Sequence, residues 1–396
     1  MDKRPGVLHL LHTRGGGLDA HVRSVATLSC GHYRHWLLRV GGDGWWLSPE
    51  DEPQLHGTAL RVRWGNPLSR LVSKLNASIL HVHHVSGDRR RLLRALRWTS
   101  VPFLVTVHDF YWVCPRVHLV QPGESYCGAP SVAACRQCLS LCPQLPIRPD
   151  SWRTSNGRVL RRAHAVVCPT RAVADTMRAH FPGLKLKTLP HDQPPGLVAE
   201  APPEPPALDT RKPLVVAVIG ALGAEKGGWR VERLAARCRE LELPIRWLVV
   251  GDTICRGGPQ TLIDGWLHVT GSYRREDLPG ILARHGPSVA AFPGVGPESW
   301  SLTLDEAWAC GLPAMVPDLG ALGERVAGQG AGWVINDWTR DEAWLEALMA
   351  LRSRRGVQGW ETASERARAY TRALPGCPPV VACYEALLHR KPLEGE

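Results

Sequence analysis

The sequence lacks an apolar run long enough to cross a lipid bilayer. Its longest one, from Leu214 to Ala224, is about half of the roughly 20 residues that a membrane-spanning helix needs. Residues 1–11 also lack the uninterrupted apolar core of an export signal, because His9 stands where that core would lie. We therefore expect a soluble, cytoplasmic protein, in which clustered cysteines favour metal ligation over disulfide bonds.

Nucleic-acid and low-complexity signatures are missing as well. The sequence contains no heptad repeat, zinc finger or RNA-binding motif, so we do not expect a nucleic-acid partner. With 44% hydrophobic and 21% charged residues, the composition excludes a disordered, collagen-like or small disulfide-stabilised chain. A length of 396 residues exceeds one ordinary core and suits two domains of roughly 100–200 residues each.

Acidic residues are scarce in the first half of the chain. Residues 1–193 hold 26 Lys and Arg against 12 Asp and Glu, a net charge of +14, whereas residues 194–396 hold 22 against 25, a net charge of −3. The basic half should meet an acidic partner, such as a phosphate-bearing substrate or an anionic membrane surface. A solvated surface helix is the ordinary alternative for its densest part. That part contains Arg89, Arg90, Arg91, Arg94 and Arg97.

Short apolar segments alternate with helical ones, which is the pattern of a doubly wound α/β fold with parallel strands. The predicted strands are 7–12, 79–84, 103–108 and 165–170 in the first half, and 214–219, 246–250, 267–270, 289–292 and 314–316 in the second. The proline-rich segment 194–213 reads as a linker. We therefore predict an N-terminal domain over 1–193, a C-terminal domain over 214–375 and a final helix within 376–396.

Glycines follow the first predicted strand, at the edge where doubly wound sheets bind their ligands. Gly15, Gly16 and Gly17 stand between this strand and a helix predicted from Asp19. Glycines at such a point let backbone amides approach a phosphate closely. The loop is neither a dinucleotide fingerprint nor a Walker A motif, so a plain tight turn is an equal alternative.

A more specific motif, PESWSLTLDEAWACGLP, follows the strand predicted to end at Phe292. A helix that starts near Ser301 would leave the amides of Ser301, Leu302 and Thr303 unpaired and facing an anion. Glu298 precedes this helix and Glu306 lies more than one turn along it, so the two carboxylates could bind different hydroxyl groups of one ligand. Either glutamate alone would be an ordinary surface residue.

Lys226 lies in the connection after the first strand of the second domain, within the sequence Glu225-Lys226-Gly227. It could neutralise a diphosphate held by the nearby helix start. A surface lysine in a turn is the ordinary alternative.

Taken together, the glutamate motif, the Glu-Lys-Gly sequence, the glycine loop and the His-Asp pair of TVHDFYWVCPR resemble retaining glycosyltransferase family 4. The similarity runs from Gly15 to about Asn336. It implies the GT-B fold, in which two doubly wound Rossmann-like domains face a central cleft and the final helix, within 376–396, returns to the N-terminal domain. It also implies an enzyme of the hexosyltransferase type, which moves a sugar from a nucleotide-diphosphate sugar to an acceptor hydroxyl and keeps the anomeric configuration.

The resemblance assigns roles to the residues of the second domain. Glu306 would hold the ribose hydroxyls of the donor, and Glu298 would contact hydroxyls of the donor sugar. Lys226 and the amides from Trp300 to Thr303 would hold the diphosphate. Glu298 as a covalent nucleophile is a less favoured alternative to a mechanism in which the leaving phosphate helps to deprotonate the acceptor.

In the first domain, the resemblance places Gly16 and Gly17 against the diphosphate and His108 near the reacting carbon, with Asp109 beside it. A cleft-edge histidine bonded to the backbone is the alternative for His108. The family usually has an arginine five residues before the lysine, where this chain has Ala221. Arg171 is the candidate replacement.

No Asp-x-Asp pair is present, and this pair is the usual minimum set of Mg²⁺ or Mn²⁺ ligands in other transferase folds. We therefore expect catalysis that needs no metal or other cofactor.

Five cysteines lie in an excursion of the first domain, over residues 114–142. Four thiolates suit a tetrahedral structural zinc, and the spacing Cys-x2-Cys within the excursion is typical of such sites. Unligated thiols and an iron–sulfur cluster are the alternatives. The first-choice ligands are Cys114, Cys127, Cys135 and Cys138, with Cys142 spare.

Two functional hypotheses follow. In the first, the chain is an active transferase in cell-surface glycan or polysaccharide synthesis, which takes a glycan or lipid-linked acceptor and contacts the inner face of the membrane through its basic domain. In the second, motivated by Ala221, the chain is a non-catalytic sugar-nucleotide-binding scaffold with the same fold. A phosphorylase or epimerase has no positive support, because no pyridoxal-phosphate lysine site is found.

Overall fold

The computed structural model divides into two compact units. It describes residues 3–12, 16–42, 44–49, 58–60, 67–123, 125–145, 147–192, 208–253, 258–372 and 377–389. The first unit contains residues 1–117, 129–195 and 375–396, and the second contains residues 118–128 and 196–374. Most of the predicted linker lies outside the described residues, and its last part, from Leu208, packs into the second unit.

Residues 118–128 belong to the second unit, so the predicted assignment of the whole cysteine-rich excursion to the first domain is wrong for this segment. This short segment packs on Gly296 of the second unit, which has no side chain to keep it away. A Cβ atom at Gly296 would lie only 2.6 Å from Cγ2 of Val120.

The first unit is built on a sheet whose described strands run in the order β4-β3-β2-β1-β5-β6-β7-β8. The strands are β1 (Gly6–Leu11), β2 (Arg34–Gly41), β3 (Gly44–Pro49), β4 (Thr58–Leu60), β5 (Ala77–Val82), β6 (Phe103–Thr106), β7 (Ala165–Cys168) and β8 (Leu186–Thr188). The pairs β2–β3 and β3–β4 are antiparallel, an edge that the sequence did not predict. The four predicted strands are present, but each ends one or two residues early, because its last polar residues already belong to the loop at the carboxyl end.

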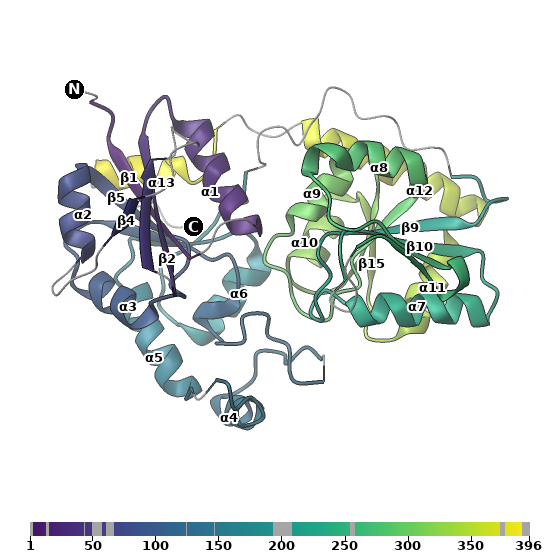
Figure 1. Cartoon of the computed structure of the whole chain (residues 1–396), viewed down its shortest axis with the longest axis horizontal. Coiled ribbons are helices and arrows are strands. Elements are labelled where there is room, and N and C mark those ends of the chain that lie inside the picture. Colours follow the sequence, from purple (N-terminus) through teal and green to yellow (C-terminus); the bar gives the residue numbers. More distant parts are fainter. Residues whose placement is uncertain are drawn as a thin grey trace. The chain divides into compact units, whose positions relative to one another are not determined.

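Helices cover this sheet, and one of them comes from the far end of the sequence. The helical segments are α1 (Gly16–Ser29), α2 (Pro67–Leu75), α3 (Arg89–Trp98), the 3₁₀ turn η1 (Phe110–Trp112), α4 (Val132–Ser140), α5 (Pro149–Leu160), α6 (Arg171–His180) and α13 (Val381–Leu388). Tyr384 and Leu387 of α13 share a hydrophobic cluster with Val7 and Ile79 of the central strands. Figure 1 shows α13, in yellow, beside β1 and β5.

The second unit has a sheet in the order β11-β12-β10-β9-β13-β14-β15 among the described residues, with β11 the antiparallel edge strand. Its strands are β9 (Leu214–Ile219), β10 (Ile245–Val250), β11 (Gln260–Leu262), β12 (Leu267–Val269), β13 (Val289–Ala291), β14 (Ala314–Pro317) and β15 (Gly332–Ile335). Its helical segments are α7 (Gly228–Glu240), the 3₁₀ turns η2 (Ile263–Gly265) and η3 (Arg275–Asp277), α8 (Leu278–His285), α9 (Leu302–Ala309), α10 (Gly320–Gln329), α11 (Asp341–Ala350) and α12 (Arg354–Arg372).

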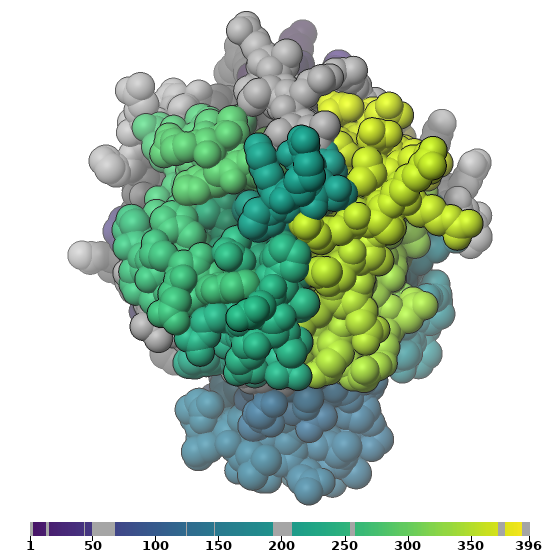
Figure 2. All heavy atoms as spheres, turned by 90° about the vertical axis from the view of Figure 1, so that its right-hand side faces the viewer, coloured from purple at the N-terminus to yellow at the C-terminus, as the bar shows by residue number. Residues whose placement is uncertain are grey.

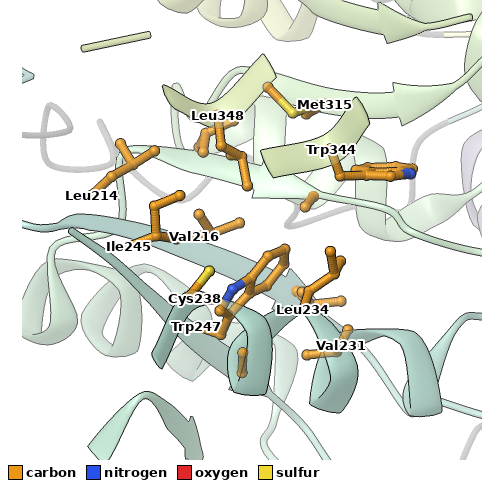
Figure 3. Packing of buried hydrophobic residues seen from close by; sticks show 14 of the residues in the cluster. Leu214, Val216, Val231, Leu234, Cys238, Ile245, Trp247, Met315, Trp344 and Leu348 are labelled. Atoms are coloured by element: carbon orange, nitrogen blue, oxygen red, sulfur yellow. The ribbon is translucent and has the colours of Figure 1, made fainter. Parts of the chain in front are cut away.

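Helices pack on both faces of this sheet, which is why β9 and β10 read as continuous apolar runs in the sequence. On one face, side chains of α7 and α11 meet those of β9 and β10 around the indole rings of Trp247 and Trp344 (Figure 3). At the surface, the yellow-green side chains of the segment that contains α12 lie beside the green and teal side chains of the earlier part of the unit (Figure 2). No helix in the described ranges is both long and apolar enough to pass through a membrane.

Burial of Trp344 predicts a large loss of stability on truncation. Its side chain is fully buried, and its indole nitrogen donates a hydrogen bond to the carbonyl oxygen of Trp338 at 2.9 Å. We expect Trp344→Ala to lower the free energy of unfolding by about 3–5 kcal/mol, measured by urea denaturation. Trp229→Ala is the matched control, because Trp229 lies in α7 of the same unit and is exposed; a similar loss in both variants would contradict the packing described above.

Candidate functional site

The second unit brings Lys226 and Glu298 together. Lys226 lies in the connection after β9, and Glu298 lies in the connection after β13, the neighbouring parallel strand. The ammonium nitrogen of Lys226 is 3.8 Å from Oε1 of Glu298, and both side chains remain partly exposed. A cation and a carboxylate are therefore available to one ligand at the carboxyl edge of this sheet.

Backbone contacts join the two connections. The carbonyl oxygen of Glu225 accepts hydrogen bonds from the amides of Val295 at 2.9 Å and Gly296 at 3.3 Å. Gly227 has a left-handed backbone with φ of 79°, and a Cβ atom there would lie 2.2 Å from the carbonyl oxygen of Pro293. This close approach requires glycine and fixes the position of the preceding Lys226.

The start of α9 is held in a strained conformation by a buried arginine. Ser301 precedes the helix with φ of 75°, which is rare for a residue with a side chain, and its side chain does not cap the helix. The guanidinium of Arg325 donates to the carbonyl oxygens of Trp300 at 2.8 Å and Ser301 at 3.1 Å, and it pairs with the buried carboxylate of Asp305. The guanidinium group of Arg325, about twenty residues further along the chain, thus fixes the position of the start of α9.

Trp300 belongs to this packing. Its indole nitrogen donates to Asp305 at 2.9 Å, the guanidinium of Arg325 covers its ring at 3.7 Å, and only 5% of the residue is exposed. The ring is therefore part of the packing of the second unit and is covered by protein groups.

Thr303, in the first turn of α9, lies against the end of β9. A Cβ atom at Gly220 would be 3.3 Å from Cγ2 of Thr303. Through this contact and the pair with Glu298, the predicted diphosphate-binding residues of the second unit gather at one edge of its sheet. They are Lys226, Ser301, Leu302 and Thr303.

The carboxylate of Glu306, which was expected to bind ribose hydroxyls, already has two partners within the protein. Glu306 is buried, and its carboxylate accepts a hydrogen bond from Nε of Arg275 at 2.8 Å and from the hydroxyl of Tyr273 at 3.3 Å. Burial raises the pKa of Glu306, although Arg275 and Tyr273 oppose this effect. A ligand hydroxyl would have to share this carboxylate with both side chains, which sequence reasoning missed.

In the first unit, Asp109 is a fixed carboxylate beside His108. It accepts a hydrogen bond from the amide of Tyr111 at 2.9 Å, which caps η1, and it lies 3.2 Å from Nε2 of His84. Burial opposes its ionisation, but the hydrogen bonds and the charge of His84 lower the pKa of Asp109 below its usual value. Asp109 is therefore ionised at neutral pH and held in place by the backbone.

His108 ends a chain of hydrogen-bonded histidines that the sequence analysis did not predict. Nε2 of His108 is 2.9 Å from Nδ1 of His83, and Nε2 of His83 is 2.9 Å from Nδ1 of His9. Nε2 of His9 is in turn 2.9 Å from Nδ1 of His35, whose Nε2 lies 3.0 Å from the hydroxyl of Ser29. The chain crosses the sheet from β2 through β1 and β5 to the end of β6.

The direction of this chain follows from its far end. The hydroxyl of Ser29 has one hydrogen, which it donates to the carbonyl oxygen of Val25 at 2.6 Å, so Nε2 of His35 must be the donor to Ser29. Burial lowers the pKa values of His9, His83 and His108 well below the ordinary value of 6.5. With neutral rings, each Nε2–H therefore donates to the next ring, and the proton of His108 is placed on Nε2.

His21 and Asp192 form a second buried group next to this chain. Both nitrogen atoms of His21 lack hydrogen-bond partners among the described residues, and Nδ1 of His21 is 4.0 Å from the carboxylate of Asp192. The ring of His21 lies 5.1 Å from that of His108 and 4.0 Å from that of His191. One ligand atom each from His21, His83 and His108 lies within 4.8 Å of the others, so this group could also hold a metal ion.

The remaining predicted residues of the first unit lie at the starts of helices. The helix α1 begins at Gly16, earlier than the predicted Asp19, and Gly16 has a φ of 74°. Gly16 and Gly17 are exposed, whereas Gly15 lies outside the described residues. Arg171 is the exposed first residue of α6, directly after the carboxyl end of β7.

The structure does not assemble the predicted zinc ligands. Among the described residues, which include all five of these cysteines, no three sulfur atoms lie within 4.8 Å of one another. Guanidinium groups contact two of the thiols instead: Arg153 lies 3.1 Å from Sγ of Cys135, and Arg116 lies 2.6 Å from Sγ of Cys142. Cys127 belongs to the second unit and the others to the first. The four-thiolate set of Cys114, Cys127, Cys135 and Cys138 stays a prediction.

Comparison with known proteins bears on the fold and the family. The family model described as Glycosyltransferase Family 4 matches residues 49–191. The chain is similar to sucrose-phosphate synthase from Thermosynechococcus elongatus, with a TM-score of 0.64, 15% identity, and coverage of 98% of this chain and 99% of that one. It is also similar to Anabaena Alr3699/HepE in complex with UDP-glucose, with a TM-score of 0.60, 15% identity, and coverage of 97% and 98%.

A third similar structure is WaaG, a glycosyltransferase involved in lipopolysaccharide biosynthesis, with a TM-score of 0.56, 14% identity, and coverage of 93% and 95%. Among curated proteins, none matches this chain. The predicted GT-B fold is confirmed, and the resemblance to glycosyltransferase family 4 is confirmed over residues 49–191.

The backbone conformation of Gly227 predicts that alanine substitutions at Gly227 and Gly280 have opposite effects on stability. We expect Gly227→Ala to lower the free energy of unfolding by about 2 kcal/mol or more, because the methyl group would meet Pro293 in a left-handed backbone. Gly280→Ala is the control: Gly280 lies in α8 with open space around it, and alanine should stabilise that helix by up to about 1 kcal/mol. Urea denaturation measures both, and effects of the same sign would contradict this account.

The buried histidines predict that the first unit unfolds in mild acid. Burial lowers the pKa values of His9, His81, His83 and His108 well below 6.5, so these rings stay neutral in the folded protein while the unfolded chain binds protons below about pH 6.5. Their contribution to the free energy of unfolding is therefore fully present above about pH 6.5 and is lost as the pH falls. Between about pH 7.5 and about pH 5.5, each such histidine should remove about 1.4 kcal/mol from the free energy of unfolding.

Urea denaturation followed by circular dichroism at the two pH values measures this loss. His9→Gln should reduce the pH dependence, whereas His32→Gln should leave it unchanged, because His32 is exposed and outside the chain of histidines. Equal unfolding free energies of the unmodified protein at both pH values would contradict the prediction.

Proposed function

We propose that this chain is a retaining glycosyltransferase, which moves a sugar from a nucleotide-diphosphate sugar to an acceptor hydroxyl without a metal ion. The observation that carries the proposal is the pair formed by Lys226 and Glu298 at the carboxyl edge of the second sheet, next to the start of α9. The family match and the fold support the same activity.

In the proposed donor complex, the diphosphate lies against Lys226 and the first amides of α9. Ser301 does not cap these amides with its side chain, and the positive end of the helix dipole favours an anion there. Negative charge grows on the departing diphosphate in the transition state, so fixed donors at this point lower the barrier. A sugar nucleotide is a reasonable donor, since Anabaena Alr3699/HepE has been solved with UDP-glucose.

Glu298 would bind hydroxyl groups of the donor sugar, and Glu306 would reach the ribose after sharing its carboxylate with Arg275 and Tyr273. On the acceptor side, His108 presents a ring whose Nε2 proton is committed to His83, and the adjacent Asp109 is ionised. These groups would stabilise positive charge on the sugar while the leaving phosphate accepts the proton of the acceptor. Gly16, Gly17 and Arg171 complete the proposed set.

The acceptor is proposed to be a glycan or lipid-linked molecule in cell-surface polysaccharide synthesis. The net charge of +14 in residues 1–193 favours an acidic acceptor or an anionic membrane surface. The similarity to WaaG, a glycosyltransferase involved in lipopolysaccharide biosynthesis, agrees with this role.

A second candidate function is a sugar-nucleotide-binding scaffold without catalysis. Ala221 favours it, because this exposed residue stands where the family usually has a diphosphate-binding arginine. The two functions differ in turnover and agree in nucleotide binding.

Kinetics with a panel of sugar nucleotides test the proposal, after a thermal-shift screen has identified a donor that raises the melting temperature. We expect Lys226→Ala to lower the rate of transfer or donor hydrolysis by about 10²–10³-fold, because one diphosphate contact is lost. Lys212→Ala removes an equal charge from an exposed position of the same unit and should have little effect. Nucleotide binding with no turnover in the unmodified protein, and none in Lys226→Ala, would favour the scaffold.

A further inference from the structure

A cavity of about 770 Å³ lies in the first unit, and none of the residues assigned to donor or acceptor binding above lines it. It is bounded by the start of α3, by η1, by the segment before α5 and by α5 itself. The ring of Tyr111 and the apolar side chains of Leu145 and Ile147 form part of its wall. Four arginines also line it: Arg89, Arg90, Arg148 and Arg158.

The charges around this cavity are not balanced. Asp150 is its single acidic lining residue, and this carboxylate is shared by Arg148 at 2.9 Å and Arg136 at 3.5 Å. Arg90 and Arg158 have no acidic partner among the described residues. A hollow with an excess of guanidinium groups concentrates anions.

Arg89 is held in place by neutral groups. Its guanidinium stacks on the ring of Trp152 at 3.8 Å and donates to the hydroxyl of Ser155 at 2.7 Å and to Oδ1 of Asn156 at 2.8 Å. Its Nε is buried and has no hydrogen-bond partner in the described part of the chain. A cation that is partly removed from water without a carboxylate beside it is costly unless an anion arrives to offset the loss.

The surrounding helices keep this arrangement rigid. The indole nitrogen of Trp152 donates to the carbonyl oxygen of Tyr111 at 2.8 Å, and the amide group of Asn156 donates to that of Trp112 at 2.8 Å. The helix α5 is thereby fixed to η1, the turn that begins after Asp109. A ligand in the cavity would lie against the same connection that carries His108.

We propose that this cavity binds a phosphate ester or diphosphate group through Arg89, Arg90 and Arg158. Arginine forks match the oxygens of phosphate in pairs, and the wall of Tyr111, Leu145 and Ile147 suits a ring or an apolar chain attached to the phosphate. This proposal rests on the proposed function. The phosphate group would belong to the acceptor, because the cavity lies in the first unit and adjoins the connection that carries His108. The bound group is then either a soluble phosphate ester or the headgroup of a lipid.

Calorimetric titration of the full chain with inorganic pyrophosphate tests this site, in the Lys226→Ala background so that the proposed donor site does not contribute. We expect saturable binding that the double substitution Arg90→Gln and Arg158→Gln weakens at least about tenfold, because two charged donors are lost. Arg94→Gln is the matched control: Arg94 is exposed on α3 and does not line the cavity, so it should change the affinity by less than about twofold. No saturable binding, or equal weakening by Arg94→Gln, would overturn the proposal.

Sedimentation with phosphatidylcholine vesicles, with and without phosphatidic acid, distinguishes the two sources. Binding to the acidic vesicles that pyrophosphate displaces and that the double variant loses indicates a lipid headgroup. Binding of pyrophosphate alone indicates a soluble phosphate ester. Titration with UDP of the otherwise unmodified protein and of the double variant separates this site from the proposed function. If neither protein binds UDP while pyrophosphate still binds the cavity, the proposed function is rejected and the cavity site remains.

Discussion

Both units bury polar side chains near the carboxyl ends of their parallel strands, and each of these groups needs a partner inside the protein. In the second unit the partner is Arg325, which binds Asp305 and the carbonyl oxygens that precede α9. In the first unit the partners are the imidazole rings themselves, which form a row of hydrogen bonds from Ser29 to His108. The start of α9, next to Glu298, and the ring of His108, next to Asp109, are both positioned by this requirement.

The sheet of each unit was accessible from the sequence because buried parallel strands appear as apolar runs. The proximity of Lys226 and Glu298 was accessible for the same reason, since each follows one of two predicted strands and the carboxyl ends of such strands share an edge. The antiparallel edge of the first sheet was not. Its strand β2 contains Arg39, whose burial depends on a pair with Asp19 of α1 at 2.9 Å, and a local pattern does not show such a partner.

The same limit explains the errors at the candidate sites. The burial of Trp300 could not be predicted from the local sequence, because Arg325, which covers its ring, lies 25 residues further along the chain. Glu306 was expected to offer its whole carboxylate to a ligand, because the local sequence does not show that Arg275 and Tyr273 contact it from another connection. A signal for the histidine chain was present, since His81 in β5 and His83 directly after it are two residues apart and so point to the same face of the sheet. The local sequence does not show that His9 and His35 lie beside them.

The helix α13 has a consequence for the order in which the protein acquires its structure during synthesis. Tyr384 closes the first unit through a hydrogen bond of 2.6 Å to His81, and its neighbours cover Val7 and Ile79 of the earliest strands. On the ribosome, the N-terminal sheet emerges first but waits with an uncovered face while the whole second unit is translated. The packing of the first unit is therefore completed only after α13 has been translated, and until then the chain exposes the apolar side chains of β1 and β5 that α13 covers.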